Sequence, residues 1–464
     1  MDNRDVELAQ RVAQMVAAQG GTTYYIGGYV RDRLRGQENK DVDIEVHGIT
    51  PAQLADILDS LGGRMAVGES FGIYRIRGYD LDIAMPRREK ANGRGHRDFE
   101  IFVDPNIGTY KAALRRDFTV NAILQNVLTG EIIDHFGGIK DIQNGIIRHV
   151  NEQTFAEDPL RVLRAAQFAA RFGYTVAAET IGVCRSIDLS ELSSERVLGE
   201  LEKALLKSDK PSVFFEVLRQ MHQLDDWFCE LSQLIGVQQN PKYHAEGDVW
   251  VHTMMVLDEA AAYREKVENP LGFMLGALTH DFGKAISTRE IDGEIRARNH
   301  ETEGLPLVRT FLRRLTNERE LIRYVLNLAE LHMKPNMLAA GGASVKATNK
   351  MFDAAIDPEA LICLSCADGL GKRPVTAGNA DFLQKRLAVY REYMSRPYVS
   401  GKDLLDAGLQ PSPQFSEYLA FAHKLRLAGV DKSAALRQTL AMGRTERKSL
   451  CTASKKKNIK EKPD

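Results

Sequence analysis

The chain changes character about a third of the way along its length, and this change most limits the folds open to it. In the first part, short β-branched and aromatic runs predict strands at 22–26 and 42–46. Helical patterns at 6–18 and 51–61 separate them. From about Glu157 onward, apolar residues recur with the 3.6-residue period of helices and strand signals are few. We therefore predict an α+β fold, with an α/β head followed by an all-helical remainder.

Composition excludes several classes of protein. The chain has 464 residues, 44% of them hydrophobic and 27% charged, which suits several globular domains. No run approaches the roughly 18 apolar residues of a membrane span, and the acidic, helical N-terminus does not resemble a secretory signal. Five scattered cysteines favour a reduced compartment, and the Cys363–Cys366 pair lacks a second pair that would complete a zinc site. We expect a cytoplasmic protein with no membrane partner.

A glycine pair marks the first candidate binding feature. Residues 26–32, IGGYVRD, stand where a predicted strand runs into a helix. Gly27 and Gly28 would let the backbone approach a phosphate, and the helix N-terminus offers free N–H groups. Arg31, in the first helical turn, adds a guanidinium for phosphate oxygens. A Gly-Gly turn of this kind also occurs without any ligand, so this feature needs support from elsewhere.

Two aspartates supply that support. Asp41 and Asp43 stand at i and i+2 of a predicted strand, which directs both carboxylates to one face, with Cα atoms about 6.6 Å apart. Such a pair is costly to bury unless a cation neutralises it. Two Mg²⁺ ions can bridge such carboxylates to a triphosphate and activate an attacking hydroxyl. The alternative for Asp41 and Asp43 is an exposed strand face. Asp82, in a later predicted strand, is a candidate third ligand.

The order of the motifs resembles a known superfamily. GGYVRD followed by DVDI resembles the nucleotidyltransferases. Two further motifs, LRRDFTVNAI at 114–123 and EDPLRVLR at 157–164, narrow the resemblance. The chain is similar over residues 24–172 to the class II tRNA nucleotidyltransferases, which are CCA-adding enzymes, and to their bacterial poly(A) polymerase relatives.

This resemblance implies that a pair of side chains selects the incoming base. The pair is Asp158 and Arg161, which the helical pattern places on one face at i and i+3. A carboxylate accepts a hydrogen bond from the amino group of cytosine or adenine and repels the carbonyl oxygen of uracil or guanine. The alternative is an ion pair on a helix surface.

Further roles follow from the same resemblance. Arg115 and Arg164 would contact the nucleotide and its triphosphate, whereas Asp117 and Asn121 would orient that site. The basic segment 86–116 matches the flexible loop of the family, and its presence favours addition of the terminal A as well as of the two C residues.

The helical half carries a second constellation of polar residues. In chain order it contains His252, His280, Asp281, His300, His332 and Asp368. The His280-Asp281 pair, followed by Gly-Lys, resembles the HD phosphohydrolases, whose H…HD…D set binds one or two divalent metal ions. Imidazole and carboxylate together suit Ni²⁺, Mn²⁺ or Co²⁺. The resemblance implies 2′,3′-cyclic phosphodiesterase, 2′-nucleotidase and phosphatase activities, with His300 and His332 as extra ligands. A degenerate, purely structural HD domain is the alternative.

The resemblance also predicts how the chain is divided. The expected parts are a nucleotidyltransferase head at 1–150, a helical neck with the template helix at 151–240, an HD-type metal domain at 241–385, and a helical tail with a disordered basic end at 386–464.

Together these features predict an enzyme that adds C, C and A to the 3′ end of tRNA from CTP and ATP. Asp41 and Asp43 would hold Mg²⁺, and a second divalent transition metal would bind in the HD domain. Three alternatives stay open. They are an A-adding or poly(A)-adding enzyme, a metal-dependent phosphohydrolase with a vestigial head, and a non-enzymatic RNA-binding or chaperone protein without metal dependence.

Overall fold

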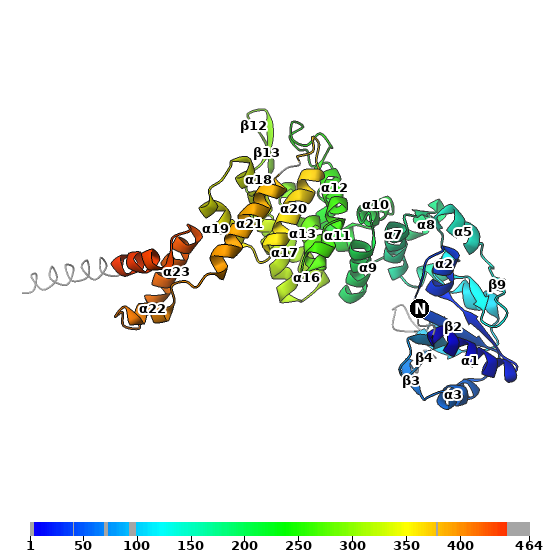
Figure 1. The fold of residues 1–464 in the computed structure, drawn as a ribbon. Coiled ribbons are helices and arrows are strands. Elements are labelled where there is room, and N and C mark those ends of the chain that lie inside the picture. Colours follow the sequence, from blue (N-terminus) through cyan, green and yellow to red (C-terminus); the bar gives the residue numbers. More distant parts are fainter. Residues whose placement is uncertain (1–3, 40, 69–72, 92–98, 377–378, 443–464) are drawn as a thin grey trace, which may run out of the picture. The chain divides into compact units, whose positions relative to one another are not determined.

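A computed structural model describes residues 4–39, 41–68, 73–91, 99–376 and 379–442. The chain divides into two compact units (Figure 1). The first, unit 1, comprises residues 1–232 with 314–316, and the second, unit 2, comprises 233–313 with 317–464. The finer division into head, neck, HD domain and tail stays a prediction.

Unit 1 is built on a seven-stranded sheet with the strand order β3-β4-β5-β2-β1-β8-β9. The strands are β1 Thr22–Tyr25, β2 Val42–His47, β3 Arg64–Gly68, β4 Ile73–Ile76, β5 Leu81–Ala84, β8 Leu124–Asn126 and β9 Ile132–Ile133. Strands β2 and β5 are parallel, whereas the other neighbours are antiparallel. The strands predicted at 22–26 and 42–46 are confirmed.

The two faces of β2 differ in polarity. Val42, Ile44 and Val46 are buried apolar residues, and the alternate positions carry Asp43 and Glu45. Helices α1 (Arg4–Ala18) and α3 (Pro51–Ser60), both predicted from the sequence, belong to the same part of unit 1, and α1 packs on β1 and β2. This packing leaves the polar face of β2 available for a site.

Unit 1 contains further helices, both between the strands of the sheet and after them in the sequence. They are α2 Gly27–Leu34, α4 Thr109–Leu114, α5 Gly138–Asn144, α6 Glu152–Ala156, α7 Leu160–Phe172, α8 Ala178–Cys184, α9 Ser194–Lys207, α10 Ser212–Gln220 and α11 Asp225–Ser232. Helix α7 packs against α9 and α10. Within the predicted flexible segment, β6 (Arg87–Ala91) pairs with β7 (Phe99–Val103), and residues 92–98 lie outside the described residues.

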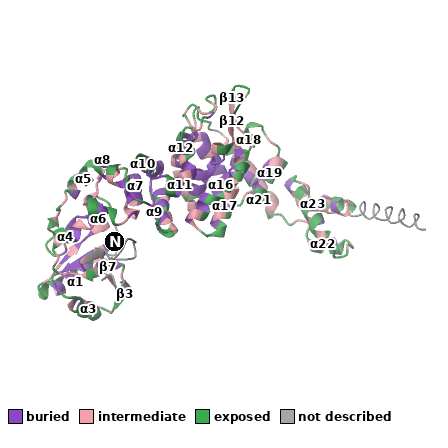
Figure 2. Ribbon diagram, turned by 180° about the vertical axis from the view of Figure 1, so that it is seen from behind, coloured by how far each residue is buried: buried purple, intermediate pink, exposed green. Residues whose placement is uncertain are grey.

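Unit 2 is mainly helical. Its helices are α12 Val249–Ala261, α13 Pro270–Thr279, α14 Lys284–Ser287, α15 His300–Glu303, α16 Leu305–Leu315, α17 Arg319–Leu331, α18 Met333–Ala340, α19 Val345–Ala354, α20 Pro358–Leu370, α21 Ala380–Ser395, α22 Gly401–Asp406 and α23 Phe415–Leu427. Helix α13 is apolar on every side because α12, α17 and α20 all pack on it. Buried residues gather at the centre of this group (Figure 2). Within the described residues, no helix is long and apolar enough to cross a membrane.

The predominantly helical part also contains short strands that the helical pattern did not predict. Strand β11 (Thr175–Val176) pairs in parallel with β10 (Ile146–Ile147), which precedes the helical part, and β12 (Thr288–Ile291) and β13 (Glu294–Ala297) form a hairpin. The hairpin turn is Asp292-Gly293, with φ of 55° and 76°. An Asp-Gly dipeptide between alternating residues is a strong hairpin signal because both turn positions need positive φ.

The CxxC pair lies on a helix. Cys363 is buried and Cys366 half-buried on α20, and both are free thiols. Burial raises the pKa of the Cys363 thiol to about 12, which keeps it protonated and poorly suited to metal binding.

Candidate active sites

The glycine pair forms the start of helix α2, beside Asp43 of strand β2. Gly27 has φ of 63°, and a Cβ atom there would lie 3.6 Å from Arg116 Nη1 and 3.8 Å from Asp43 Oδ2. A side chain at this position would therefore be strained and would also occupy space beside the carboxylate. A Cβ atom added at Gly28 would lie 3.4 Å from both Arg31 Nη2 and Asn39 Nδ2.

The carboxylates of Asp41 and Asp82 lie near that of Asp43. Asp43 pairs in register with Asp82 of the parallel strand β5, and Asp41 precedes β2 by one residue. Burial raises the pKa of Asp43 to about 6, with further contributions from Asp82 and Asp41, while Arg116 opposes the shift. Asp82 already accepts a hydrogen bond from Arg75 Nη2 at 3.1 Å. A divalent cation fits this group because it would relieve the repulsion that raises the pKa.

One cavity of about 460 Å³ brings most of the predicted head residues together. Its lining includes Gly27, Gly28, Arg31, Asp41, Asp43 and Arg164. Among the lining residues that no sequence motif had marked are Phe168, Arg171 and Lys203. The first two lie on α7 beyond the quoted motif, and Lys203 lies on α9. The cavity therefore combines a carboxylate group at one side with several cations, as a nucleoside triphosphate and its metal ions require.

Arg31 is held firmly rather than left as a mobile fork. Its Nε and Nη2 donate to the two oxygens of Asp32 at 2.8 and 2.9 Å, and Nη1 donates to Asn121 Oδ1 at 2.7 Å. The guanidinium also lies over the Phe172 ring, 4.7 Å from its centroid. These contacts use three of its five N–H groups, so Arg31 offers a ligand its charge and at most two further donors.

Asp117 and Asn121 connect Arg31 to Arg164. Arg164 donates through Nε and Nη2 to Asp117 Oδ2 at 2.9 and 2.6 Å, and Asn121 Nδ2 donates to Asp117 Oδ1 at 3.0 Å. Burial would raise the pKa of Asp117, but Arg164 and these hydrogen bonds lower it overall. The arrangement is compatible with the orienting role predicted for Asp117 and Asn121, which stays a prediction.

The prediction that Asp158 and Arg161 share one face of a helix is wrong. Helix α6 ends at Ala156 and α7 begins at Leu160, so Asp158 lies in the break between them. Proline at position 159 explains the break, because the residue before a proline is disfavoured in helical conformation. Asp158 Oδ1 instead accepts from the Leu160 amide at 3.1 Å.

Each member of that pair has another partner. Arg196 Nη2, on α9, donates to both oxygens of Asp158 at 2.9 Å. Arg161 donates to the backbone carbonyls of Thr154 and Arg115, the latter at 2.7 Å. Asp158 and Arg161 nevertheless line one cavity of about 360 Å³, which shares Arg116, Asp117 and Arg164 with the first cavity.

Glu45 is a residue of this region that the sequence analysis missed. Its carboxylate is 1% exposed and lies 2.9 Å from His47 Nε2, 3.6 Å from Arg115 Nη2 and 3.5 Å from Arg116 Nη2. Burial opposes ionisation, but His47 and the two arginines lower the pKa of Glu45 to about 2. The signal was present, because Glu45 continues the period-two face of Asp41 and Asp43.

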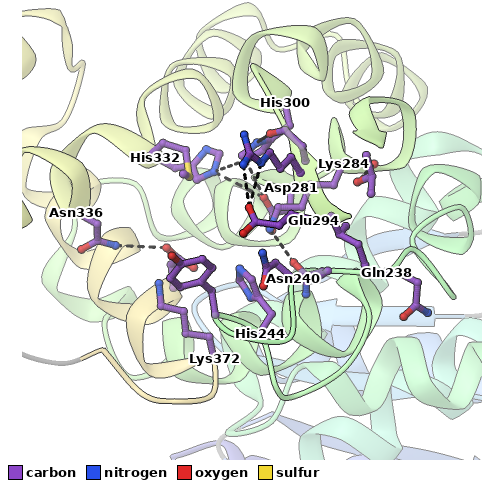
Figure 3. Close-up of a pocket in the computed structure, with 18 of the residues that line it drawn as sticks. Gln238, Asn240, His244, Asp281, Lys284, Glu294, His300, His332, Asn336 and Lys372 are labelled. Carbon is purple, nitrogen blue, oxygen red and sulfur yellow. Dashed lines mark hydrogen bonds and ion pairs between the residues drawn. The ribbon is translucent and has the colours of Figure 1, made fainter. Parts of the chain in front are cut away.

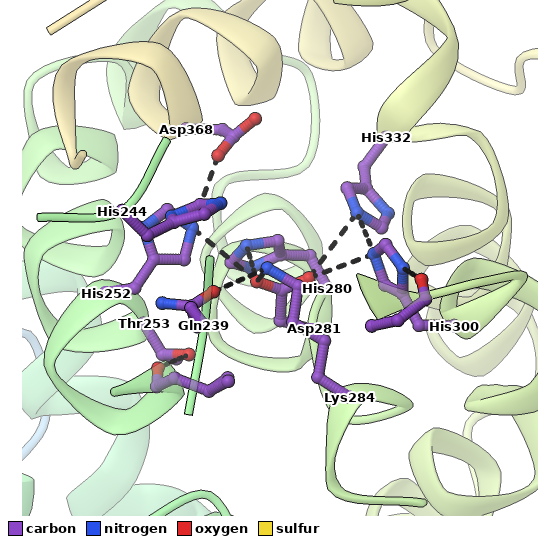
Figure 4. Close-up of polar contacts among 12 residues, drawn as sticks. Gln239, His244, His252, Thr253, His280, Asp281, Lys284, His300, His332 and Asp368 are labelled. Carbon is purple, nitrogen blue, oxygen red and sulfur yellow. Dashed lines mark hydrogen bonds and ion pairs between the residues drawn. The ribbon is translucent and has the colours of Figure 1, made fainter. Parts of the chain in front are cut away.

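The second constellation assembles in unit 2 around Asp281. Its members come from α12 (His252), the end of α13 (His280, Asp281), α15 (His300), the end of α17 (His332) and α20 (Asp368) (Figure 4). Asp281 Oδ2 lies 3.2 Å from His280 Nε2 and 3.5 Å from His252 Nε2. Asp281 Oδ1 lies 3.1 Å from His300 Nε2 and 3.7 Å from His332 Nε2.

The histidines are oriented as metal ligands are. Nδ1 of His280, His300 and His332 lies 2.8, 2.9 and 2.7 Å from the carbonyl oxygen three residues earlier. This contact places the proton on Nδ1 and turns the lone pair of Nε2 inward. The two Nε2 atoms of His300 and His332 lie 3.2 Å apart. Facing lone pairs at this distance require a cation or a proton between them.

Two groups of donor atoms share Asp281. One comprises His252, His280 and Asp281, and the other comprises Asp281, His300 and His332. His252 Nε2 also lies 3.3 Å from Asp368 Oδ1. Within the described residues, the buried Nε2 atoms of His252 and His280 have no hydrogen-bond partner. The donor set therefore fits divalent transition-metal ions, with Asp281 able to bridge two of them.

A cavity of about 390 Å³ opens onto this cluster (Figure 3). Lys284 Nζ lies 2.7 Å from Asp281 Oδ2, and Lys372 lines the same cavity. Sequence analysis missed Glu246, whose Oε1 lies 2.8 Å from His244 Nδ1 and 3.0 Å from His252 Nδ1. Such a carboxylate fixes the orientation of a ligating imidazole. An acid six residues before His252 carries no periodic signal that would have marked it.

Comparison with known proteins agrees with this geometry. The model of the poly(A) polymerase head domain matches residues 23–148, and that of the HD domain matches residues 249–371. A multifunctional CCA protein of Actinobacillus pleuropneumoniae serotype 5b (strain L20) is 35% identical over 323 residues, which are 68% of this chain and 76% of that protein. The chain belongs to the family of multifunctional CCA proteins. Another relative in this family, from Stenotrophomonas maltophilia (strain K279a), is 42% identical over 274 residues, 58% of this chain and 65% of that protein.

Solved structures share the fold of this CCA-family protein. The Thermotoga maritima CCA-adding enzyme complexed with tRNA_CCA matches with a TM-score of 0.63 and 20% identity, over 95% of this chain and 96% of that chain. A CCA-adding enzyme in complex with ATP matches with a TM-score of 0.66 and 19% identity, over 95% and 94% of the two chains. The predicted fold class is thus confirmed, and both of its domain families depend on metal ions.

Proposed function

We propose that this protein adds the 3′-terminal CCA sequence to tRNA from CTP and ATP, without a nucleic-acid template. The carrying observation is that Asp41 and Asp43 line one cavity with the glycine-rich start of α2 and several cations, while Asp82 is paired beside Asp43. Relatives named as multifunctional CCA proteins support the proposal, as do fold neighbours solved with tRNA, ATP and CTP.

In this reaction the terminal hydroxyl oxygen of tRNA forms a bond to the α-phosphorus, and pyrophosphate leaves. Asp41 and Asp43 would hold Mg²⁺, which supplies charge neutralisation and favours ionisation of the attacking hydroxyl. The chain itself positions the triphosphate. The α2 backbone at Gly27 and Gly28 admits it closely, and the fixed guanidinium of Arg31 offsets its charge.

Base selection, in this proposal, uses Asp158 and Arg161 after an exchange of partners. Asp158 must release Arg196 and Arg161 must release at least one carbonyl before either can meet the edge of a base. The pair of Asp158 and Arg196 is about a third exposed, so its separation costs about 1 kcal/mol or less. A correctly paired base would compensate for that cost.

The deciding experiment is primer extension on tRNA transcripts that end at N73, C74 or C75, each with CTP, ATP or both. We expect two C residues and then one A, with Mg²⁺ required. Extension of the C75 transcript alone would identify an A-adding enzyme, and unlimited A addition would identify a poly(A) polymerase. Absence of any extension would contradict the proposal.

A second activity is favoured by a separate observation, the sharing of Asp281 between two donor groups. We propose that the cluster holds divalent transition-metal ions and hydrolyses phosphoesters such as 2′,3′-cyclic phosphates. The ions would supply a nucleophilic hydroxide, and Lys284 and Lys372 would attract the phosphate. Phosphate release with Ni²⁺, Mn²⁺ or Co²⁺ tests it, and inactivity with all three would contradict it. We also place the protein in the cytoplasm, in line with the four free thiols among its described residues.

A further inference from the structure

A groove in unit 2, outside both cavities described above, carries four arginines. Helices α16 and α17 form a hollow of about 1010 Å³. Arg309 and Arg313 project from α16, and Arg319 and Arg323 project from α17. Each pair is spaced i, i+4, which places both side chains on one helix face about 6 Å apart along the axis. The groove therefore has two short rows of guanidinium groups.

These charges are largely uncompensated. Within the part of the chain that the structure describes, Arg309, Arg313 and Arg319 form no ion pair. Arg323 lies 2.7 Å from Glu320, but the two side chains are 67% and 76% exposed, so this ion pair is weak. Glu330 is the only acidic residue in the groove lining. Like charges gathered in one concavity repel one another, and an anionic partner would remove that repulsion.

The groove lining also includes apolar residues, one of which lies on a loop that is held in place. Ile322 and Leu326 of α17 and Ile356 from the loop before α20 line the groove, and Ile356 is 43% exposed. Asn327 holds that loop, because its Nδ2 donates to the Ala354 carbonyl at 2.9 Å and its Oδ1 accepts from the Ile356 amide at 2.8 Å. A groove lined by both guanidinium groups and apolar side chains suits a partner with a charged edge and a less polar body.

We propose that this groove binds the sugar–phosphate backbone of tRNA, away from the 3′ end at which nucleotides are added. The inference rests on the proposed function, which makes tRNA the polyanion this chain must hold. Guanidinium groups bind phosphate through two parallel hydrogen bonds, and arginine is favoured where such recognition is needed. Because backbone contacts carry no base information, the groove serves tRNAs of any sequence.

The test compares matched pairs of substitutions in the full-length protein. Arg309→Ala with Arg313→Ala, and Arg319→Ala with Arg323→Ala, each remove one row. The control is Lys346→Ala with Lys350→Ala, which removes two exposed cations at the same i, i+4 spacing on α19. Binding of a full-length tRNA transcript is measured over a range of salt concentrations. Thermal unfolding checks that each variant folds.

We expect each groove variant to bind tRNA at least about 10-fold more weakly near 0.1 M salt. The slope of log affinity against log salt should fall by about two, one for each lost phosphate contact, while the control stays within about twofold of wild type. Nucleotide addition by these variants should need correspondingly more tRNA to reach half of its maximal rate. Unchanged tRNA affinity in the groove variants, or an equal loss in the control, would overturn the groove. Absence of nucleotide addition by the wild type would instead overturn the proposed function, and the binding assay would still report on the groove.

Discussion

Asp43 and Asp82 occupy paired positions on the neighbouring parallel strands β2 and β5, so two carboxylates lie side by side, and Asp43 also lines the head cavity. Arg75 contacts only Asp82 of the two, through Nη2 at 3.1 Å. Burial and the neighbouring charge of Asp82 raise the pKa of Asp43 to about 6. This imbalance identifies Asp43 as the side chain that most needs a metal ion.

Replacement of Asp41 or Asp43 by Ala should abolish nucleotide addition. Each change removes a carboxylate that would hold Mg²⁺, and the loss should be several kcal/mol of transition-state stabilisation. Addition is measured by primer extension. Binding of tRNA, measured by filter retention, should persist. Asp59→Ala, an exposed carboxylate of the same unit that pairs with Arg64, is the control. More than about a tenth of wild-type activity, a deficit under roughly 1.4 kcal/mol, would show that the carboxylate holds no metal.

Stability without metal should depend on pH through Asp43. The folded protein binds the Asp43 proton more tightly than the unfolded chain, because the pKa rises from 3.8 to about 6. The free energy of unfolding should therefore fall as pH rises from about 4 to about 6, by up to about 3 kcal/mol from this group. Chemical unfolding in EDTA at several pH values measures it. Asp43→Asn should remove this part of the pH dependence, and Mg²⁺ should restore stability to the wild type alone; identical profiles for wild type and variant would refute the assignment.

Asp158→Ala should relax base selection. The change removes both the acceptor for the amino group of cytosine or adenine and the repulsion of a carbonyl oxygen. One base contact discriminates by about 1–3 kcal/mol, so the preference for CTP over UTP should fall roughly five- to 150-fold. Competition between CTP and UTP measures this preference.

The structure supplies a control for that experiment. Arg196→Ala removes the present partner of Asp158 and leaves its carboxylate intact. This variant should select bases as the wild type does. Equal relaxation in both variants would mean that the ion pair itself matters, and full selectivity in Asp158→Ala would limit Asp158 to capping α7 and pairing with Arg196.

Substitutions in the HD cluster should separate the two activities. Asp281→Ala removes the carboxylate shared by both donor groups, so metal content and cyclic-phosphate hydrolysis should both be lost while CCA addition persists. His300→Ala should lower the metal content from two ions to one, measured by elemental analysis. The control is His423→Ala, at a histidine paired with Asp353, which should change neither the metal content nor cyclic-phosphate hydrolysis. Simultaneous loss of nucleotide addition and thermal stability would show that Asp281 acts in folding.

The sequence by itself determined the succession of elements and the side chains that share one face. The helical pattern at 51–61 predicted α3, and the structure shows a capping box at Thr50 where this helix begins. The alternation of Asp41 and Asp43 and the Gly-Gly turn were readable because the periods of 2.0 and 3.6 residues are local properties of the backbone. The same local reasoning failed at Asp158, where Pro159 interrupts the helix that periodicity alone would continue.

Tertiary structure decided which of these faces meet. Asp82 lies beside Asp43 only because β5 pairs with β2 in that register, and a shift by one residue would turn it to the other face. Arg196 reaches Asp158 because α9 packs on α7. Asp281 collects histidines from α12, α15 and the end of α17 because those helices surround the end of α13. Contacts between distant segments depend on register and packing, which no local pattern encodes, and so the partners of each charged group emerge only in the folded chain.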